Sequence, residues 1–414
     1  MRKRFVPDAG GVFPEWEEKT LGECMTLIAS KGYKGKDLVN DEDKAIMFSP
    51  SDIDTFGVVS LVKNAHISDE LFKKSKEALV KNGDILFTKT ASIGKVGYVK
   101  NLDHNATINP QIVILRANEN VDSYFLFCAI RTESFMKQVR KISGGTTIKT
   151  MSQEALKELK IKIPKSIEEQ RKIAAALAAY DEMIAVKTTK LETWQECKKR
   201  MVKEIFGRTK RFKDDDGREF PEWEEKTLGE ISEPLKYGMS AAAVKYDGEN
   251  KYLRITDIDE SSRKYVSDKI VSPEASKVAE KFLVQKNDLL FARTGASVGK
   301  TYLYDEADGK MYYAGYLIKA HIKPEYDSQF IFQLTLTDEF KKWIKKESMR
   351  TAQPGINAEC LTKYKMMIPC MKEQQKIGSF LAEIDKEIEI QKEFIKTYAE
   401  GKKRMMRELM EKCN

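Results

Sequence analysis

An internal duplication constrains this chain more than any other feature of its sequence. The eleven residues Phe13–Glu23 return letter for letter as Phe220–Glu230, 207 positions later. A related match joins Asp84–Thr90 to Asp288–Thr294 at an offset of 204. Solenoid repeats have periods of only about 20 to 50 residues, so the repeated unit here is a whole domain. The sequence therefore predicts one molecule built from two pseudo-symmetric halves.

Composition excludes several classes of protein. The 414 residues suffice for about two to four domains with proper cores. No apolar run approaches the roughly 18 residues of a membrane span, and no apolar stretch follows the basic first residues as in a signal peptide. Six scattered cysteines suit reduced thiols, and three histidines are too few for a duplicated metal centre. We expect a cytoplasmic protein without membrane contact, and the net charge of +8 leans toward DNA without deciding it.

Each half ends in a long helical pattern with seven-residue periodicity. Residues on one seam step by alternating intervals of four and three positions over 173–205 and again over 377–409. Polar residues break both series at corresponding places, and such residues often fix helix register. These residues are Lys187, Gln391, Lys198 and Lys402.

The seam predicts that the two helices pair with each other. If the halves are related by a pseudo-two-fold axis, the helices must run antiparallel, with the globular domains at opposite ends. The alternative is that each helix packs on its own domain, but such helices usually drift toward a 3.6-residue period. The predicted pairing residues are Ile173, Leu177, Ile184, Leu191, Trp194, Ile377, Leu381, Ile384, Ile388 and Ile395.

The globular part of each half mixes short β-type runs with turns and helical patterns. This favours a mixed α/β domain with a curved, largely antiparallel sheet. The predicted fold class is thus α/β (mixed), with two pseudo-symmetric globular domains joined by two long antiparallel coiled-coil helices. We place the domains at 1–164 and 209–369 and the helices at 165–208 and 370–414.

The loop after the Phe87 and Phe291 strands is the most informative polar feature. In both halves it supplies cations, hydroxyls and a glycine, which suit contact with phosphates or base edges; a solvated β-turn is the alternative. The predicted DNA-binding residues are Lys89, Thr90, Ser92, Gly94, Lys95, Arg293, Thr294, Ser297, Gly299 and Lys300. The run 295–301 looks like a nucleotide-binding P-loop, but it has three residues between the glycines where that motif needs four.

Two further segments are weaker candidates for DNA contact. The loop before the last strand contributes Thr146, Thr147, Lys149, Arg350, Thr351 and Gln353, of which Gln and Arg are types that bind base edges. Plain loop chemistry is the alternative there. Arg254 precedes a Thr-Asp pair that matches Ser51-Asp52, although such pairs often only build turns.

No catalytic constellation is recognisable in the sequence. It lacks a dinucleotide or S-adenosylmethionine glycine fingerprint, paired metal-ligand spacing and a duplicated acid–base pair. A binding protein is favoured. A coiled-coil scaffold without base readout and a phosphate-binding enzyme remain as alternatives.

Taken together, the motifs resemble the DNA specificity (S) subunits of Type I restriction-modification systems. The resemblance rests on the Phe-Pro-Glu-Trp openings, the Asp-Leu-Leu-Phe-Ala-Arg-Thr and Ser-Val-Gly-Lys runs at 288–300, and the Thr-Ala-Gln-Pro-Gly-Ile-Asn stretch at 351–357. Ile-Pro followed by Glu-Gln-(Arg/Gln)-Lys-Ile precedes both helices. The first copy departs from the pattern with Gly-Gly-Thr-Thr-Ile at 144–148.

This resemblance implies a function and a set of partners. It implies two target recognition domains, each binding one half of a bipartite, asymmetric site on double-stranded DNA. It further implies two methylation (M) subunits that carry S-adenosylmethionine and modify adenine, and restriction (R) motor-nuclease subunits that use ATP and Mg. The chain itself is then non-catalytic and needs no cofactor.

Overall fold

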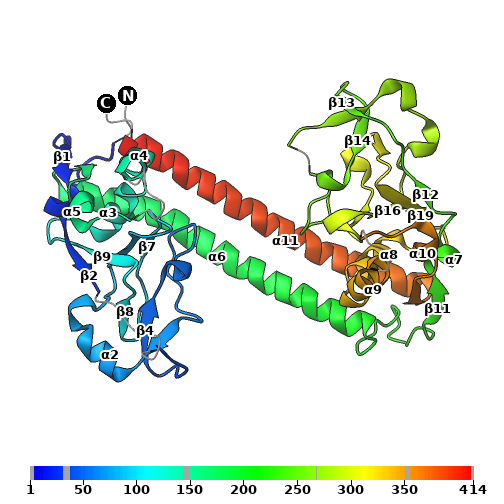
Figure 1. Cartoon of the computed structure of the whole chain (residues 1–414), viewed down its shortest axis with the longest axis horizontal. Coiled ribbons are helices and arrows are strands. Elements are labelled where there is room, and N and C mark those ends of the chain that lie inside the picture. Colours follow the sequence, from blue (N-terminus) through cyan, green and yellow to red (C-terminus); the bar gives the residue numbers. More distant parts are fainter. Residues whose placement is uncertain (1–3, 31–37, 143–149, 267, 350–353, 412–414) are drawn as a thin grey trace. The chain divides into compact units, whose positions relative to one another are not determined.

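The structure is a computed structural model and describes residues 4–30, 38–142, 150–266, 268–349 and 354–411. It divides into two compact units, which are residues 1–187 with 394–414 (unit 1) and residues 188–393 (unit 2). Each unit contains one globular domain and a part of each long helix (Figure 1). Among the helices in these described ranges, none combines the length and the apolar character needed to cross a lipid bilayer.

An antiparallel four-stranded sheet lies at the centre of unit 1. Its strand order is β2-β9-β6-β7, with bounds Met25–Ala29, Ile112–Ala117, Ile85–Thr88 and Val96–Tyr98. A second sheet, β3-β5-β4-β8, contains one parallel pair and comprises Leu38–Val39, Ala65–Ile67, Ala45–Phe48 and Ala106–Ile108. Strand β1 (Glu17–Thr20) pairs with β10 (Lys160–Ile163). The short helices are α1 Leu21–Cys24, α2 Asp69–Lys74, α3 Ser123–Ala129, α4 Glu133–Ile142 and α5 Gln153–Lys157.

Unit 2 repeats this frame. Its central sheet has the order β12-β19-β16-β17, with bounds Lys236–Tyr237, Leu317–His321, Asp288–Ala292 and Thr301–Leu303. Three strand pairs surround it: β11 Glu224–Thr227 with β20 Lys365–Ile368, β13 Ala243–Lys245 with β15 Val271–Pro273, and β14 Lys251–Leu253 with β18 Met311–Tyr313. The short helices are α7 Leu228–Ile231, α8 Ser328–Thr335, α9 Asp338–Ser348 and α10 Ala358–Thr362. The predicted mixed α/β class with a mainly antiparallel sheet is confirmed.

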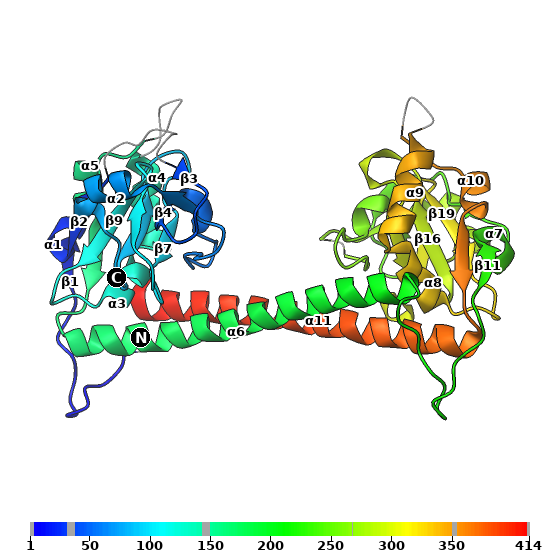
Figure 2. The same ribbon diagram turned by 90° about the horizontal axis from the view of Figure 1, so that it is seen from below.

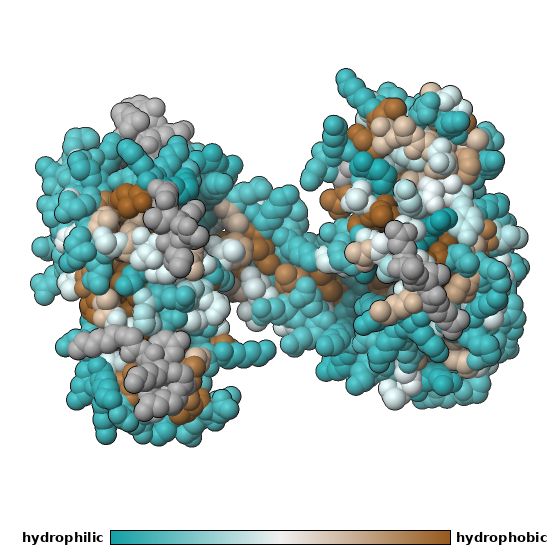
Figure 3. Space-filling view, viewed as in Figure 1, coloured by the Kyte–Doolittle hydropathy of each residue, from teal (hydrophilic) through white to brown (hydrophobic). Residues whose placement is uncertain are grey.

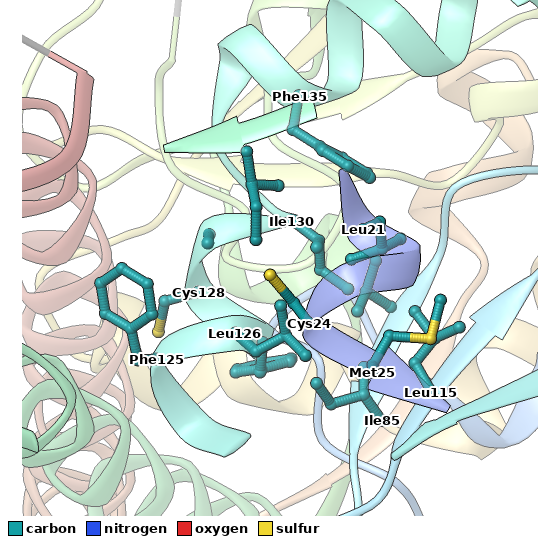
Figure 4. Packing of buried hydrophobic residues seen from close by; sticks show 14 of the residues in the cluster. Leu21, Cys24, Met25, Ile85, Leu115, Phe125, Leu126, Cys128, Ile130 and Phe135 are labelled. Carbon is teal, nitrogen blue, oxygen red and sulfur yellow. The ribbon is translucent and has the colours of Figure 1, made fainter. Parts of the chain in front are cut away.

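The core of unit 1 lies between its central sheet and α3. Phe125 and Leu126 of α3 belong to the same buried cluster as Ile85 and Leu115 of the sheet (Figure 4). Asp122 caps α3 by accepting a hydrogen bond from the Phe125 amide at 2.8 Å, as Asp and Asn typically do. Aromatic and branched side chains therefore fix α3 across the sheet in a defined orientation.

The repeated Phe-Pro-Glu-Trp segment is locked to the start of the long helix in each unit. Arg4 donates to both oxygens of Glu169, at 3.0 and 2.9 Å, and to the carbonyl of Pro14 in the repeated segment, at 2.6 Å. Arg211 likewise donates to Glu373 at 2.9 Å, and Trp223 donates to the same carboxylate at 3.2 Å. The side chains of Glu169 and Glu373 are only 1% and 0% exposed, so these charge-assisted bonds are what makes their burial tolerable. In each unit an arginine thus ties the repeated segment to the first turn of a long helix.

The glutamine that follows each buried glutamate fastens the last strand to the long helix. Gln170 donates to the Pro164 carbonyl at 2.9 Å, and Gln374 donates to the Pro369 carbonyl at 2.8 Å. Both amide groups are almost fully buried. The Ile-Pro and Glu-Gln motifs of the sequence thus form one duplicated joint.

The long helices are α6 (Ile167–Phe206) and α11 (Met371–Met406), the latter followed by a π-helical turn, Arg407–Glu411. In unit 1 the first part of α6 lies beside the last part of α11 (Figure 2). In unit 2 the last part of α6 lies beside the first part of α11. The predicted antiparallel pairing is therefore confirmed.

Two sets of polar residues bind the helix pair to the globular domains. Lys402 and Asp181 approach to 2.5 Å in unit 1, and Lys198 and Asp385 approach to 2.5 Å in unit 2. A third group from the domain completes each set: Tyr124, whose pKa is raised by burial, donates to Asp181, and Gln333 donates to Asp385 at 2.7 Å. We call these sets node 1 (Asp181, Lys402, Tyr124) and node 2 (Lys198, Asp385, Gln333).

The seam residues do more than pair the helices. Most of those predicted are buried, and several belong to the core of a globular domain: Ile173 and Leu177 in unit 1, and Ile377, Leu381, Ile384 and Ile388 in unit 2. Ile184 is also buried, whereas Leu191, Trp194 and Ile395 are half-buried. The start of each helix therefore packs on its own domain as well as pairing, so both predicted modes of packing occur.

Candidate nucleic-acid interface

The first predicted DNA-binding loop has the same backbone anchors in both units. It follows β6 as residues 89–95 and β16 as residues 293–300. The Lys89 amide donates to the Gln111 carbonyl at 2.8 Å, and the Arg293 amide donates to the Tyr316 carbonyl at 3.0 Å. The loops thus begin in equivalent places beside the neighbouring strand.

The structure brings this loop next to described residues at the end of the second predicted segment. The Lys89 carbonyl accepts from the Met151 amide and the Arg293 carbonyl accepts from the Ile356 amide, both at 2.9 Å. Isolated β-bridges join Thr90 to Thr150 and Thr294 to Gly355. The predicted contacts Thr146, Thr147, Lys149, Arg350, Thr351 and Gln353 lie outside the described residues and stay predictions. The described residues that follow them, Thr150 and Met151 in unit 1 and Gly355 and Ile356 in unit 2, lie beside the first loop.

Two lysines of the first loop are turned inward, which the sequence did not indicate. Lys95 donates to the Pro50 carbonyl at 2.8 Å. Lys300 donates to the Ile258 carbonyl at 2.9 Å, and the residue is 8% exposed. The geometry therefore favours fastening of the loop over the direct DNA contact that we expected of these ammonium groups. It also argues against a phosphate-binding P-loop at 295–301, because the ammonium group of Lys300 is already hydrogen-bonded inside the domain.

The loop glycines have a role in packing, and their close approach to DNA stays a prediction. Gly94 and Gly299 have φ values of +88° and +81°, a region that disfavours other residues. A Cβ atom on Gly94 would lie 2.6 Å from Met136, and one on Gly299 would lie 2.5 Å from Ile344. These glycines let α4 and α9 pack against the loops.

The third predicted site is a capped turn that the inward lysines reach. Arg254 donates to both carboxylate oxygens of Asp257, at 2.9 and 2.7 Å. This hydrogen bonding raises the pKa of Arg254. Ser49 and Asp52 form the matching turn in unit 1, where the Ser49 amide donates to Asp52 at 2.6 Å. Arg254 is thus held by a carboxylate within the domain, which weakens its case as a DNA contact.

The side chains that face outward differ between the two units. Arg293 lies over the ring of Tyr237, with 4.9 Å from its Cζ atom to the ring centroid. Tyr316, whose carbonyl accepts from the Arg293 amide, is 62% exposed. In unit 1 the equivalent backbone positions are occupied by Lys89 and the exposed Gln111. Within the described residues, no carboxylate lies within ion-pair distance of Lys89 or Arg293, so both cations are available to an anionic partner.

The remaining predicted loop residues are small hydroxyl side chains at the surface. Ser92 is exposed, and Thr90, Thr294 and Ser297 are half-buried. Tyr237, Tyr316 and Gln111 were missed by the sequence analysis, because nothing local to them signals that a strand ladder brings them to the loops. Their residue types alone were a weak indication of DNA contact, since aromatic side chains and Gln are common in nucleic-acid interfaces.

This surface is open rather than a closed pocket. Two surface depressions, of about 350 Å³ in unit 1 and 230 Å³ in unit 2, lie beside the β1–β10 and β11–β20 strand pairs, and none of the loop residues lines them. In the described part of the chain, no three His, Cys, Asp or Glu side chains are grouped to hold a metal ion. Loops projecting from a rigid sheet suit an extended ligand.

The duplicated domains, the antiparallel helices and the basic loops are the features expected of a DNA-recognising subunit. The family model described as "Type I restriction modification DNA specificity domain" matches residues 14–193 and 221–397. The chain therefore belongs to this family of Type I restriction-modification specificity proteins, and its function is sequence recognition on DNA.

Individual relatives agree with this assignment. The MjaVIII specificity subunit of a type I restriction enzyme from Methanocaldococcus jannaschii is 25% identical over 96% of this chain and 92% of its own. The MjaIX specificity subunit from the same organism is 26% identical over 54% of this chain and 53% of its own. The crystal structure of a Type I S subunit from M. genitalium shares the fold, with a TM-score of 0.68 and 16% identity over 98% of this chain and 99% of that one.

Proposed function

We propose that each unit binds one half of a bipartite, asymmetric site on double-stranded DNA. The observation that carries this proposal is a shared frame with different outward side chains. The backbone anchors of Lys89 and Arg293 are the same, yet the first residue offers an ammonium group and the second a planar guanidinium. Two equivalent backbone positions with different side chains suit two half-sites of different sequence.

The partner subunits are also part of this proposal. Specificity subunits of this family are non-catalytic, so the chemistry belongs to two methylation subunits with S-adenosylmethionine, which modify adenine, and to restriction subunits that use ATP and Mg. Apolar side chains of the helices in unit 1 support a docking place for the methylation subunits: Met183, Val186 and Phe394 are 39%, 51% and 40% exposed. Figure 3 shows hydrophobic residues along the helices on the face drawn. Exposed apolar patches of this kind mark protein interfaces.

A pair of substitutions tests the assignment of one half-site to each unit. In the assembled methylation complex, Lys89→Ala should reduce methylation or relax sequence preference in one half-site, and Arg293→Ala should do so in the other. Loss of a single base or phosphate contact should lower affinity about tenfold. Genome-wide mapping of methylated adenines measures both effects.

Exposed lysines away from the loops provide matched controls. Lys100→Ala in unit 1 and Lys286→Ala in unit 2 should leave the site unchanged. Lys100 follows Val99, which bonds to Asp84 near the start of β6. Lys286 precedes Asp288 at the start of β16, whereas the loops follow the other ends of these two strands. If Lys89→Ala and Arg293→Ala were as silent as these controls, the chain would act as a scaffold without base readout at these loops.

A further inference from the structure

Three positions carry the chemical difference between the two units, and this inference rests on the proposed function. In the central sheet of unit 2, Tyr237 pairs with Ile318, and Ile318 pairs with Phe291 on its other side. In unit 1, Ala29 pairs with Val113, which in turn pairs with Phe87. The two ladders therefore make Ala29 the counterpart of Tyr237. The corresponding triplets are Ala29, Lys89 and Gln111 in unit 1 and Tyr237, Arg293 and Tyr316 in unit 2.

Within the described ranges of the chain, an aromatic ring lies against the loop cation in unit 2 but not in unit 1. The hydroxyl of Tyr237 accepts a hydrogen bond from the Ala358 amide at 3.0 Å, which fixes the ring against the start of α10. Arg293 lies over that ring, and its backbone is bonded on both sides, to Tyr316 and to Ile356. The guanidinium group is therefore restricted before any ligand arrives.

A restricted guanidinium has a specific chemical use on DNA. Its planar fork can donate two parallel hydrogen bonds to O6 and N7 of guanine in the major groove. A lysine at the same frame position, such as Lys89, lacks this fork and acts as a point charge. Restricting the side chain beforehand reduces the entropy that binding must overcome.

We propose that Tyr237 is a positioning residue that holds Arg293 for a bidentate contact with guanine in the half-site bound by unit 2. Unit 1 has Ala29 at the corresponding place and makes no such contact. The half-site of unit 2 therefore contains a G·C pair whose recognition depends on the stack of Arg293 on Tyr237.

The test uses the full chain assembled with its methylation subunits and maps methylated adenines for wild type, R293K, Y237A and Y237F. R293K and Y237A should relax the preference for one G·C pair by roughly tenfold to a hundredfold, with the other half-site unchanged. Y237F keeps the ring but loses the bond to the Ala358 amide, so its relaxation should fall between wild type and Y237A. Binding to oligonucleotides over a salt series is measured in parallel.

Distinct outcomes overturn the inference. An unchanged preference in Y237A, or a wild-type half-site without a G·C pair, overturns it while the proposed function stands. Uniform weakening on all sequences, with the salt slope reduced by about one, identifies a phosphate contact instead and also overturns it. A wild-type complex without sequence preference would overturn the proposed function itself. Loss of preference in both half-sites identifies a general folding defect and counts against a positioning role.

Discussion

At the scale of single residues, Ala91 occupies a backbone conformation that its counterpart assigns to glycine. Ala91 has φ of +61°, and Gly295, at the same place in the loop of unit 2, has φ of +70°. A residue with a Cβ atom is less stable there by roughly 1–2 kcal/mol. A Cβ atom on Gly295 would meet no described atom within 4 Å, so backbone conformation decides the expected effect of substitution. The chain thus contains one strained and one relaxed copy of the same turn.

Reciprocal substitutions should shift stability in opposite directions. Ala91→Gly should raise the free energy of opening of unit 1 by about 1 kcal/mol, and Gly295→Ala should lower that of unit 2 by about 1 kcal/mol. Native-state hydrogen exchange measures the two units separately. Ala296→Gly is the control, since Ala296 is not in the positive-φ region and glycine there should not stabilise. Shifts of the same sign at 91 and 295 would contradict this account.

Residue roles were predictable only where the partner is close in sequence or the residue type is diagnostic. The sequence predicted that the loops at 89 and 293 carry cations, and the structure keeps Lys89 and Arg293 available. It did not predict that Lys300 bonds to Ile258, 42 positions away, or that Arg4 bonds to Glu169, 165 positions away. Such long-range bonds are set by tertiary packing, which local pattern does not encode.

At the scale of elements, the nodes determine how the two long helices pair. Each helix carries an aspartate followed 17 positions later by a lysine, Asp181 with Lys198 and Asp385 with Lys402. In the antiparallel pair each aspartate meets the lysine of the other helix. A parallel pair in the same register would place like charges together, which is unfavourable. The nodes therefore select both direction and register.

Node 2 offers a direct test of this selection. Lys198→Met should destabilise unit 2 by about 2 kcal/mol, because it leaves a half-buried Asp385 without its cation. The double exchange of Lys198→Asp with Asp385→Lys should recover most of that loss. Urea unfolding measures both, and Lys199→Met is the control at an exposed neighbouring position. An equal loss in the double exchange and in Lys198→Met would show that attraction between the pair is not the cause.

Element type was largely predictable, and the physical reason is periodicity. The seven-residue seam predicted α6 and α11, and it marked Lys198 and Lys402 as polar breaks. It favoured pairing over packing on the domain and did not show that Ile173, Leu177 and their counterparts do both, because a heptad pattern does not say which surface the apolar stripe meets. The partners Tyr124 and Gln333 come from other helices and were likewise invisible.

At the scale of the whole molecule, α6 and α11 each begin in one unit and end in the other. In each helix the two node residues are 17 positions apart, Asp181 and Lys198 in α6 and Asp385 and Lys402 in α11. We propose that the number of helical residues between the nodes sets the number of base pairs between the half-sites, as protein geometry sets half-site spacing in dimeric DNA-binding proteins.

Lengthening both helices together should lengthen the spacer. One heptad inserted into α6 between Asp181 and Lys198, and another into α11 between Asp385 and Lys402, adds about 10 Å, which corresponds to about three base pairs. Methylation mapping should show both half-sites unchanged and farther apart. A heptad in α6 alone should disrupt one node and abolish activity. An active variant with doubled insertions and the original spacer would refute the ruler.

The packing of α11 into the first domain has a consequence for synthesis on the ribosome. The core of unit 1 includes Leu409 and Met410, and node 1 includes Lys402. All residues of unit 2 have been translated by position 393. The domain encoded first therefore waits, incompletely packed, until after the second has all of its residues, and the nascent chain must be protected from aggregation throughout that interval.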